Sequence, residues 1–265
     1  MNFVTQAKLA IKNFIKYLPL LQNLIARELK NKYRQSVLGY VWCVLNPLLV
    51  MLILNFVFSK MFKNSIENFP VYLFVGRMFF SFMTDSTQSA TRSIVANGSL
   101  MRKTRVPNYI FTLATLCSAV VNFLFSLIAF AFVLLFTRTP ITIHAIMLPV
   151  IILQMFMFCT GFGFFLAQSN VFLRDTSYLY AVFITAWMYL TPLFYPLTSL
   201  PQSAQWVITT FNPAYFYIEQ GRMIFLYQQW PTLELLLKGF GVGLLFLAVG
   251  MFFYQRNKDK FILYI

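Results

Sequence analysis

The sequence predicts an all-α polytopic membrane protein with six transmembrane helices, amphipathic interface helices at the N-terminus and re-entrant external helices before the last span. Apolar residues make up 59% of the 265 residues and charged residues only 11%. Several uncharged runs reach the roughly 18–20 residues that a helix needs to cross a bilayer. Ordinary soluble folds do not have this composition, so they are excluded.

Residues 1–36 are expected to form amphipathic helices along the membrane surface. Lys8, Lys12 and Lys16 recur every four residues and therefore share one helix face, while apolar residues occupy the rest. Because these lysines interrupt any apolar core, the segment is not expected to be a signal peptide. Pro19 permits a break and a second helix. A pair of ordinary cytosolic helices stays open as the alternative.

Residues 37–265 are expected to form the transmembrane domain, and its uncharged stretches place the spans in order. The second span contains Arg77 and Asp85, and charges at membrane depth are costly, so this helix must face protein or water. Arg77 near an end of the span could instead extend to the interface. The six expected spans cover about 37–59, 70–90, 106–136, 141–168, 178–193 and 233–254.

A mixed segment precedes the last span, and a pair of glycines lies within it. Residues 195–231 are too mixed for a simple span and too aromatic for a soluble loop, so we expect helices that dip back into the membrane. Such breaks are tolerated only where protein or water covers them. Gly239 and Gly243 have the spacing that permits close helix approach, which more often serves packing than function.

The distribution of basic residues predicts the orientation. Of 21 Lys and Arg, 15 fall in the N-terminal segment, the second loop, the turn at Arg174 and the C-terminal tail, whereas five fall in the opposite loops. Basic loops stay in the cytoplasm, so both termini are expected there, which an even number of spans allows. The excess over seven acidic residues therefore does not indicate a nucleic-acid partner.

No constellation for catalysis or metal binding occurs in the sequence. The P-loop pattern GxxxxGK[ST] is absent, and His144 is the single histidine. Cys43, Cys117 and Cys159 lie far apart in apolar runs, without metal-ligand spacing. Asp85 is the one acid clearly inside a span, which disfavours a proton-coupled carrier. We therefore expect no catalytic residue, metal or cofactor in this chain.

Several motifs, in order and nearly from end to end, resemble the membrane subunits of ABC-2 type exporters. Within that family the resemblance is to permeases for polysaccharides such as capsule, O-antigen, rhamnan and teichoic acid. Arg77 is the main departure, because an uncharged residue is expected there. The matching motifs are RELK at 27–30, KYRQSVLGYVW at 32–42, NP at 46–47, NGSLMRKTRVP at 97–107, RD at 174–175, TPLFYP at 191–196, FNP at 211–213, and Glu219 with Arg222.

The resemblance implies a homodimer in the bacterial cytoplasmic (inner) membrane, with two copies of a separate cytosolic ABC ATPase that binds ATP and Mg²⁺. Six helices are also too few to surround a pore for a sugar polymer, so a twofold dimer would place the first and fifth spans along the shared axis. A short helix within about 91–105 would couple to the ATPase, through apolar contacts of Leu100 and Met101 and polar contacts of Arg102 and Lys103. Asn97 begins that motif.

Two sets of residues are candidates for the substrate path. Basic residues near the first span would receive the anionic head of a lipid-linked polymer, although anchoring on anionic lipid explains them equally well. Aromatic rings would offer flat faces to sugars, although each ring alone fits a lipid-facing or interfacial place. The basic set is Arg27, Lys30, Lys32 and Arg34; the aromatic set is Tyr40, Trp42, Phe56, Trp187, Tyr189 and Tyr195; the external re-entrant set is Phe211, Asn212, Pro213, Glu219 and Arg222.

The favoured function is therefore the permease subunit of an ATP-driven exporter for a lipid-linked polysaccharide. Two alternatives stay open: an ABC-2 permease for a drug or lipid, and a membrane scaffold without transport. A neighbouring ATPase subunit would separate the first two from the scaffold. Neighbouring genes for sugar-polymer biosynthesis would separate polysaccharide export from drug or lipid export.

Overall fold

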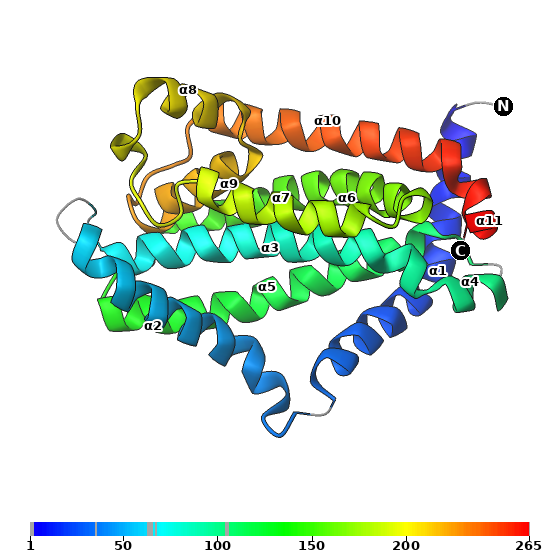
Figure 1. Ribbon diagram of the computed structural model, residues 1–265, viewed down its shortest axis with the longest axis horizontal. Coiled ribbons are helices and arrows are strands. Elements are labelled where there is room, and N and C mark those ends of the chain that lie inside the picture. The colour runs from blue at the N-terminus through cyan, green and yellow to red at the C-terminus, as the bar shows by residue number, and fades with distance from the viewer. Residues whose placement is uncertain (1–2, 35, 63–65, 67, 104–105, 265) are drawn as a thin grey trace.

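The computed structural model describes residues 3–34, 36–62, 66, 68–103 and 106–264, and these form helices and loops without a strand. Five helices run side by side along the long axis of the molecule (Figure 1). The closest packing joins α6 to α10 and α3 to α5 and α6. The five are α3 (Phe69–Ala96), α5 (Tyr109–Thr137), α6 (Leu148–Phe172), α7 (Thr176–Leu190) and α10 (Leu233–Asn257).

The N-terminal segment is one continuous helix, α1 (Phe3–Tyr33), with Pro19 inside it. The expected break at Pro19 is therefore wrong. Leu21 and Leu24, just after the proline, are buried in a cluster with residues of α5, and this contact holds the second half of the helix despite one lost backbone hydrogen bond. The side chains of Lys8 and Lys12 lie outside the described part.

Within the residues that the structure describes, four stretches are long and apolar enough to cross a membrane: Gly39–Phe58, Tyr109–Thr137, Ile143–Phe172 and Leu233–Lys260. They correspond to the first, third, fourth and last expected spans. The stretch Gly39–Phe58 consists of the 3₁₀ turn η1 (Gly39–Val41) and part of α2 (Trp42–Phe62). The stretch Ile143–Phe172 begins with the 3₁₀ helix η2 (Ile143–Met147) and continues as α6. α3 is not among the four, because its second half is polar, and α7 has only 15 residues.

α3 is the central helix, and it buries a polar second half by satisfying its hydroxyl groups locally. The hydroxyls of Thr84, Thr87 and Thr91 each donate to the carbonyl four residues earlier, at 3.0, 2.7 and 2.7 Å. Such bonds let threonine occupy an apolar helix interface without an unpaired donor. Thr87 also lies 2.6 Å from the hydroxyl of Tyr180, which ties α3 to α7.

Glycines set the distance between α6 and α10. A Cβ atom on Gly250 would overlap the backbone of Gly161, and one on Gly239 would overlap the side chain of Gln154. A Cβ on Gly243 would lie 3.1 Å from the carbonyl oxygen of Gln154. The expectation that Gly239 and Gly243 serve close helix packing is confirmed.

The molecule has two distinct ends. Both chain termini lie at one end, the terminal end, together with α4 (Gly98–Lys103) and α11 (Phe261–Tyr264) (Figure 1). The opposite end, the far end, carries η3 (Leu197–Ser199), α8 (Gln202–Phe211) and α9 (Pro213–Phe225). At the terminal end Arg174, in the turn between α6 and α7, donates to the carbonyl of Tyr264 at 3.1 Å.

Candidate functional site

The four predicted basic residues of the substrate path gather where α1 ends. Arg27, Lys30 and Lys32 lie on α1 and Arg34 directly follows it, and all four are exposed. The guanidinium of Arg27 donates to Asn97 Oδ1 at 2.6 Å. The structure therefore gives Arg27 a bonding partner inside the chain.

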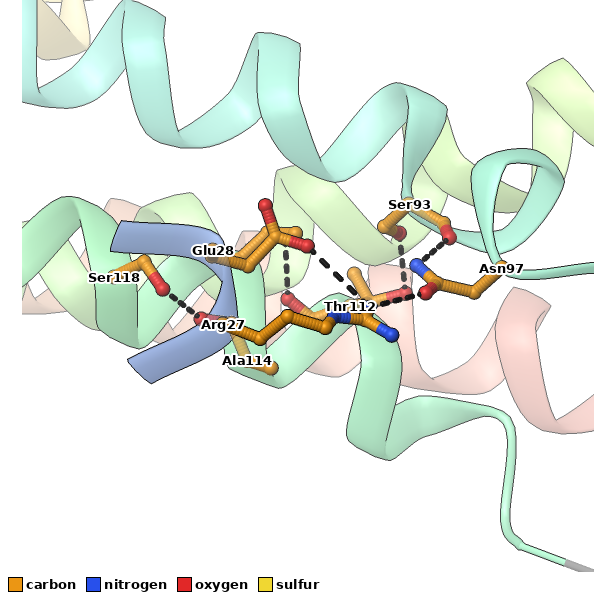
Figure 2. A network of polar contacts seen from close by, with 8 residues as sticks. Arg27, Glu28, Ser93, Asn97, Thr112, Ala114 and Ser118 are labelled. Carbon is orange, nitrogen blue, oxygen red and sulfur yellow. Dashed lines mark hydrogen bonds and ion pairs between the residues drawn. The ribbon is translucent and has the colours of Figure 1, made fainter. Parts of the chain in front are cut away.

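Figure 2 shows the polar network that Arg27 joins. Asn97, which ends α3, donates to the carbonyl of Ser93 at 2.8 Å. The hydroxyls of Ser93 and Thr112 lie 2.8 Å apart, and Arg27 also lies 3.7 Å from Glu28. α1, α3 and α5 are thus joined at the residue immediately before α4.

α4 falls within the expected coupling segment, of which residues 104–105 lie outside the described part. Arg102 and Lys103 are exposed, as a contact with a partner requires, and Leu100 is half-buried. Met101 is only 5% exposed and belongs to the cluster that includes Phe261. The expectation that Met101 offers an apolar contact to a partner is corrected: its burial holds α4 against the bundle.

Substituting Arg27 by methionine is expected to lower the free energy of unfolding by about 1 kcal/mol, below the roughly 1.5–3 kcal/mol of charged hydrogen bonds because solvent screens the partly exposed side chain. The melting temperature of the purified chain in detergent measures this loss. Lys30→Met is the matched control, since Lys30 is an exposed cation on the same helix. Equal melting temperatures for the two variants would contradict a structural role of the Arg27–Asn97 bond.

The aromatic candidates divide into open and buried positions. Tyr40, Trp42 and Phe56, on η1 and α2, are 52%, 38% and 77% exposed, and Tyr189 on α7 is 63% exposed. Trp187 is buried, and its indole N–H donates to Asn212 Oδ1 at 2.8 Å. In this structure Trp187 therefore fixes α7 to the far end.

Trp187, Tyr189 and Tyr195 nevertheless line one cavity of about 890 Å³, bounded by α6, α7, α8 and α10. Its walls are mostly aromatic and aliphatic. Burial raises the pKa of Tyr195, whose hydroxyl donates to the carbonyl of Tyr189 at 2.8 Å. The structure therefore brings three of the predicted rings together.

At the far end, Arg222 of α9 forms the centre of a buried clamp. It is 1% exposed, donates to the carbonyl of Pro192 at 2.7 Å and lies 3.6 Å from Glu219. Its guanidinium carbon lies 3.5 Å from the centroid of the Tyr72 ring, a cation–π contact with α3. The Tyr72 hydroxyl donates to the carbonyl of Tyr195 at 2.9 Å. Together these groups fix the loop after α7.

The sequence Phe211-Asn212-Pro213 explains where α9 begins. Asn212 Oδ1 accepts from the backbone N–H of Ala214 at 3.1 Å, and Pro213 occupies the first helical position, where its missing N–H has no cost. Asn212 Nδ2 also donates to Thr191 Oγ1 at 3.0 Å. Phe211 is exposed and packs edge-on against Trp206.

Two buried amide side chains, Gln154 in the apolar run of α6 and Gln220 in the more polar α9, were not predicted from the sequence. Gln220 Nε2 donates to Gln154 Oε1 and to the carbonyl of Leu235, both at 3.1 Å, which joins α9, α6 and α10. A single amide in an otherwise apolar span is the signal that could have found Gln154, since such groups need a partner in the bundle. In the described part of the chain no three His, Cys, Asp or Glu form a metal-binding group.

An all-helical bundle with several apolar stretches of spanning length, an exposed basic helix and broken helices at one end is the architecture of a multi-pass membrane protein. The sequence matches the ABC-2 type transporter family over residues 19–226, so the chain belongs to this family. It is thereby the membrane component of a transporter.

Three relatives share the name "O-antigen export system permease protein RfbA". The protein from Myxococcus xanthus is 28% identical over 253 residues, 95% of this chain and 97% of the relative. Two proteins from Klebsiella pneumoniae are 26% and 27% identical, over 89% and 76% of this chain and 90% and 77% of the relatives.

Proposed function

We propose that this chain is the permease subunit of an ATP-driven ABC exporter that moves a lipid-linked polysaccharide across the bacterial cytoplasmic membrane. The observation that carries the proposal is its likeness, over 95% of its own length and 97% of the relative's, to a permease named for O-antigen export. The candidate site agrees with this function, since exposed cations at the end of α1 lie beside an aromatic-bearing first span.

In the proposed architecture α2, α3, α5, α6, α7 and α10 are the six spans. α7, with 15 residues, is about 22 Å long at 1.5 Å per residue, short of the roughly 30 Å of a hydrocarbon core. The chain continues as a loop, residues 191–194, which is buried. A buried loop followed by α8 and α9 is what a re-entrant region requires.

The same proposal places the terminal end in the cytoplasm. α4, the turn at Arg174 and the C-terminal residues lie at that end together with the N-terminus, and these segments carry most of the basic residues. The positive-inside rule then assigns the far end to the external side. α1 would lie along the cytoplasmic interface.

The proposed complex is a homodimer with two cytosolic ATPase subunits, which bind ATP and Mg²⁺. α2 and α7 support the dimer because both expose apolar side chains: Leu52 and Phe56 on α2 are 58% and 77% exposed, and Val182 on α7 is 71% exposed. A second copy along these helices would put the substrate path at the shared axis. Exposed Arg102 and Lys103 support a contact between α4 and the ATPase.

Depletion of the chain in its source bacterium tests this function against the alternatives. We expect long lipid-linked glycans to accumulate inside the cell and surface polymer to fall, as measured by glycan electrophoresis of separated fractions. Normal surface polymer with raised drug sensitivity would favour a drug permease. Normal surface polymer and normal drug sensitivity, together with defective assembly of another membrane complex, would favour a scaffold.

A further inference from the structure

Arg77, the charge in α3 that the family resemblance leaves unexplained, lines a cavity of about 270 Å³ between α2, α3 and α5. We propose that this cavity binds the phosphate of a lipid head group, with Arg77 as the main contact. The proposal rests on the proposed function, because a prenyl diphosphate that carries a glycan is the expected source of that phosphate. The volume is close to the roughly 300 Å³ at which ligand pockets begin, so it suits a head group and not a polymer.

The bonding of Arg77 leaves most of its five N–H donors available. Its hydrogen bond goes to the thioether of Met188 at 3.5 Å, and thioether sulfur is a weak acceptor. Among the residues that the structure describes, Arg77 takes part in no ion pair. A cation at membrane depth is costly unless an anion offsets it, and the planar guanidinium matches a phosphate in two-point contact.

The electrostatics of the cavity select an anion. Its charged lining residues are Lys32, Arg77 and Asp85, so cations exceed anions by one. Asp85 lies eight residues after Arg77 on the same helix, which is about 12 Å along the axis at 1.5 Å per residue. Asp85 still interacts electrostatically with Arg77 and Lys32, so a phosphate that binds at the Arg77 end competes with this carboxylate.

The remaining polar groups suit the hydroxyls beside such a phosphate. Ser81 lies between Arg77 and Asp85 on the same face of α3, because residues four apart align along a helix. On the opposite wall, Asn122 Oδ1 of α5 is buried without a hydrogen-bond partner. A buried acceptor of this kind gains from a hydroxyl donor, which a sugar or a glycerol supplies.

The cavity is also connected to the proposed receiving surface. Lys32, from the end of α1, lines it together with Trp42 and Asn46 from the first turns of α2. A head group that meets the basic residues of α1 thus reaches Arg77 by way of the first span.

Binding of three probes to the full-length chain in detergent, followed by native mass spectrometry, tests the site. The probes are farnesyl diphosphate, dioleoylphosphatidylglycerol and uncharged farnesol. Arg77→Gln is expected to weaken binding of the phosphate probes at least tenfold, while Arg256→Gln, which removes an exposed cation outside the cavity, leaves it within twofold. Asp85→Asn is expected to tighten binding about two- to tenfold, the Coulomb effect of one charge at about 12 Å.

Preference for farnesyl diphosphate supports the lipid-linked substrate as the source, and equal Arg77-dependent binding of phosphatidylglycerol supports bulk phospholipid. Wild-type affinity in Arg77→Gln, or farnesol bound as tightly as its diphosphate, would overturn the proposal. If Arg77→Gln does not fold, Asp85→Asn decides: unchanged or weaker binding overturns the site. The binding experiment does not involve transport. A lack of Arg77-dependent binding would therefore overturn the site and leave the proposed function standing. Normal surface polymer after depletion would overturn the proposed function and leave the binding result standing.

Discussion

Arg222→Met is expected to lower the free energy of unfolding by about 3 kcal/mol, because removal of one partner of a buried charge pair leaves the other uncompensated. Glu219 would lose its 3.6 Å partner, and the carbonyl of Pro192 would lose a 2.7 Å hydrogen bond. The melting temperature of the chain in detergent should fall by several degrees.

Two further variants show which property of Arg222 is responsible for the expected loss of stability. Arg222→Lys keeps the charge but loses the planar contact with Tyr72, so an intermediate loss is expected. Arg256→Met removes an exposed arginine and should leave the melting temperature unchanged. A melting temperature of Arg222→Met within about 1 °C of the wild type would refute the clamp, since a loss of about 3 kcal/mol shifts it several times as far.

Reversing both charges of α4, with Arg102→Glu and Lys103→Glu, is expected to reduce polymer export at least tenfold while the chain still inserts and folds. Both side chains are exposed at the terminal end, so their replacement leaves the buried core of the bundle intact, whereas opposite charges would repel a complementary ATPase surface. Surface polymer and the amount of ATPase that co-purifies with the chain are the two measurements.

The matched control reverses Lys258 and Lys260 on η4 (Lys258–Lys260), which are exposed at the same end and give the same change in net charge. Export should stay near wild type in this control. Equal loss of export in both double variants would indicate a general charge effect, and normal export with Arg102→Glu and Lys103→Glu would exclude α4 as the coupling element.

The helices of high apolar content could be predicted from the sequence, because length and hydropathy alone specify them, as in α5 and α10. The continuity of α1 through Pro19 could not, since it depends on the burial of Leu21 and Leu24 against distant α5. Propensity at one residue is weaker than such tertiary packing.

In the candidate site, too, the positions of the residues could be predicted from the sequence but their distant bonding partners could not. Motifs located Asn97 at one end and Asn212 and Arg222 at the other, but each of these residues also bonds to a distant partner, Arg27, Trp187 and Pro192 respectively. The bond from Arg27 to Asn97 spans 70 positions, and the Tyr72–Pro192 contact spans 120. Neither periodicity nor a local motif carries information over such separations.

The glycine seam between α6 and α10 has a mechanical consequence. Where the backbones of Gly161 and Gly250 touch directly, no flexible side chain lies between the helices to absorb a sliding motion. α6 and α10 must therefore travel as one rigid body whenever the protein changes conformation. The displacement that opens a passage falls instead to α2, whose broad open face leaves it freer to tilt than α7, which is bonded to α3 and to the start of α9. The protein thus has a rigid part, α6 and α10, held together by glycine contacts, and a mobile part, α2, which bears the rings of Trp42 and Phe56.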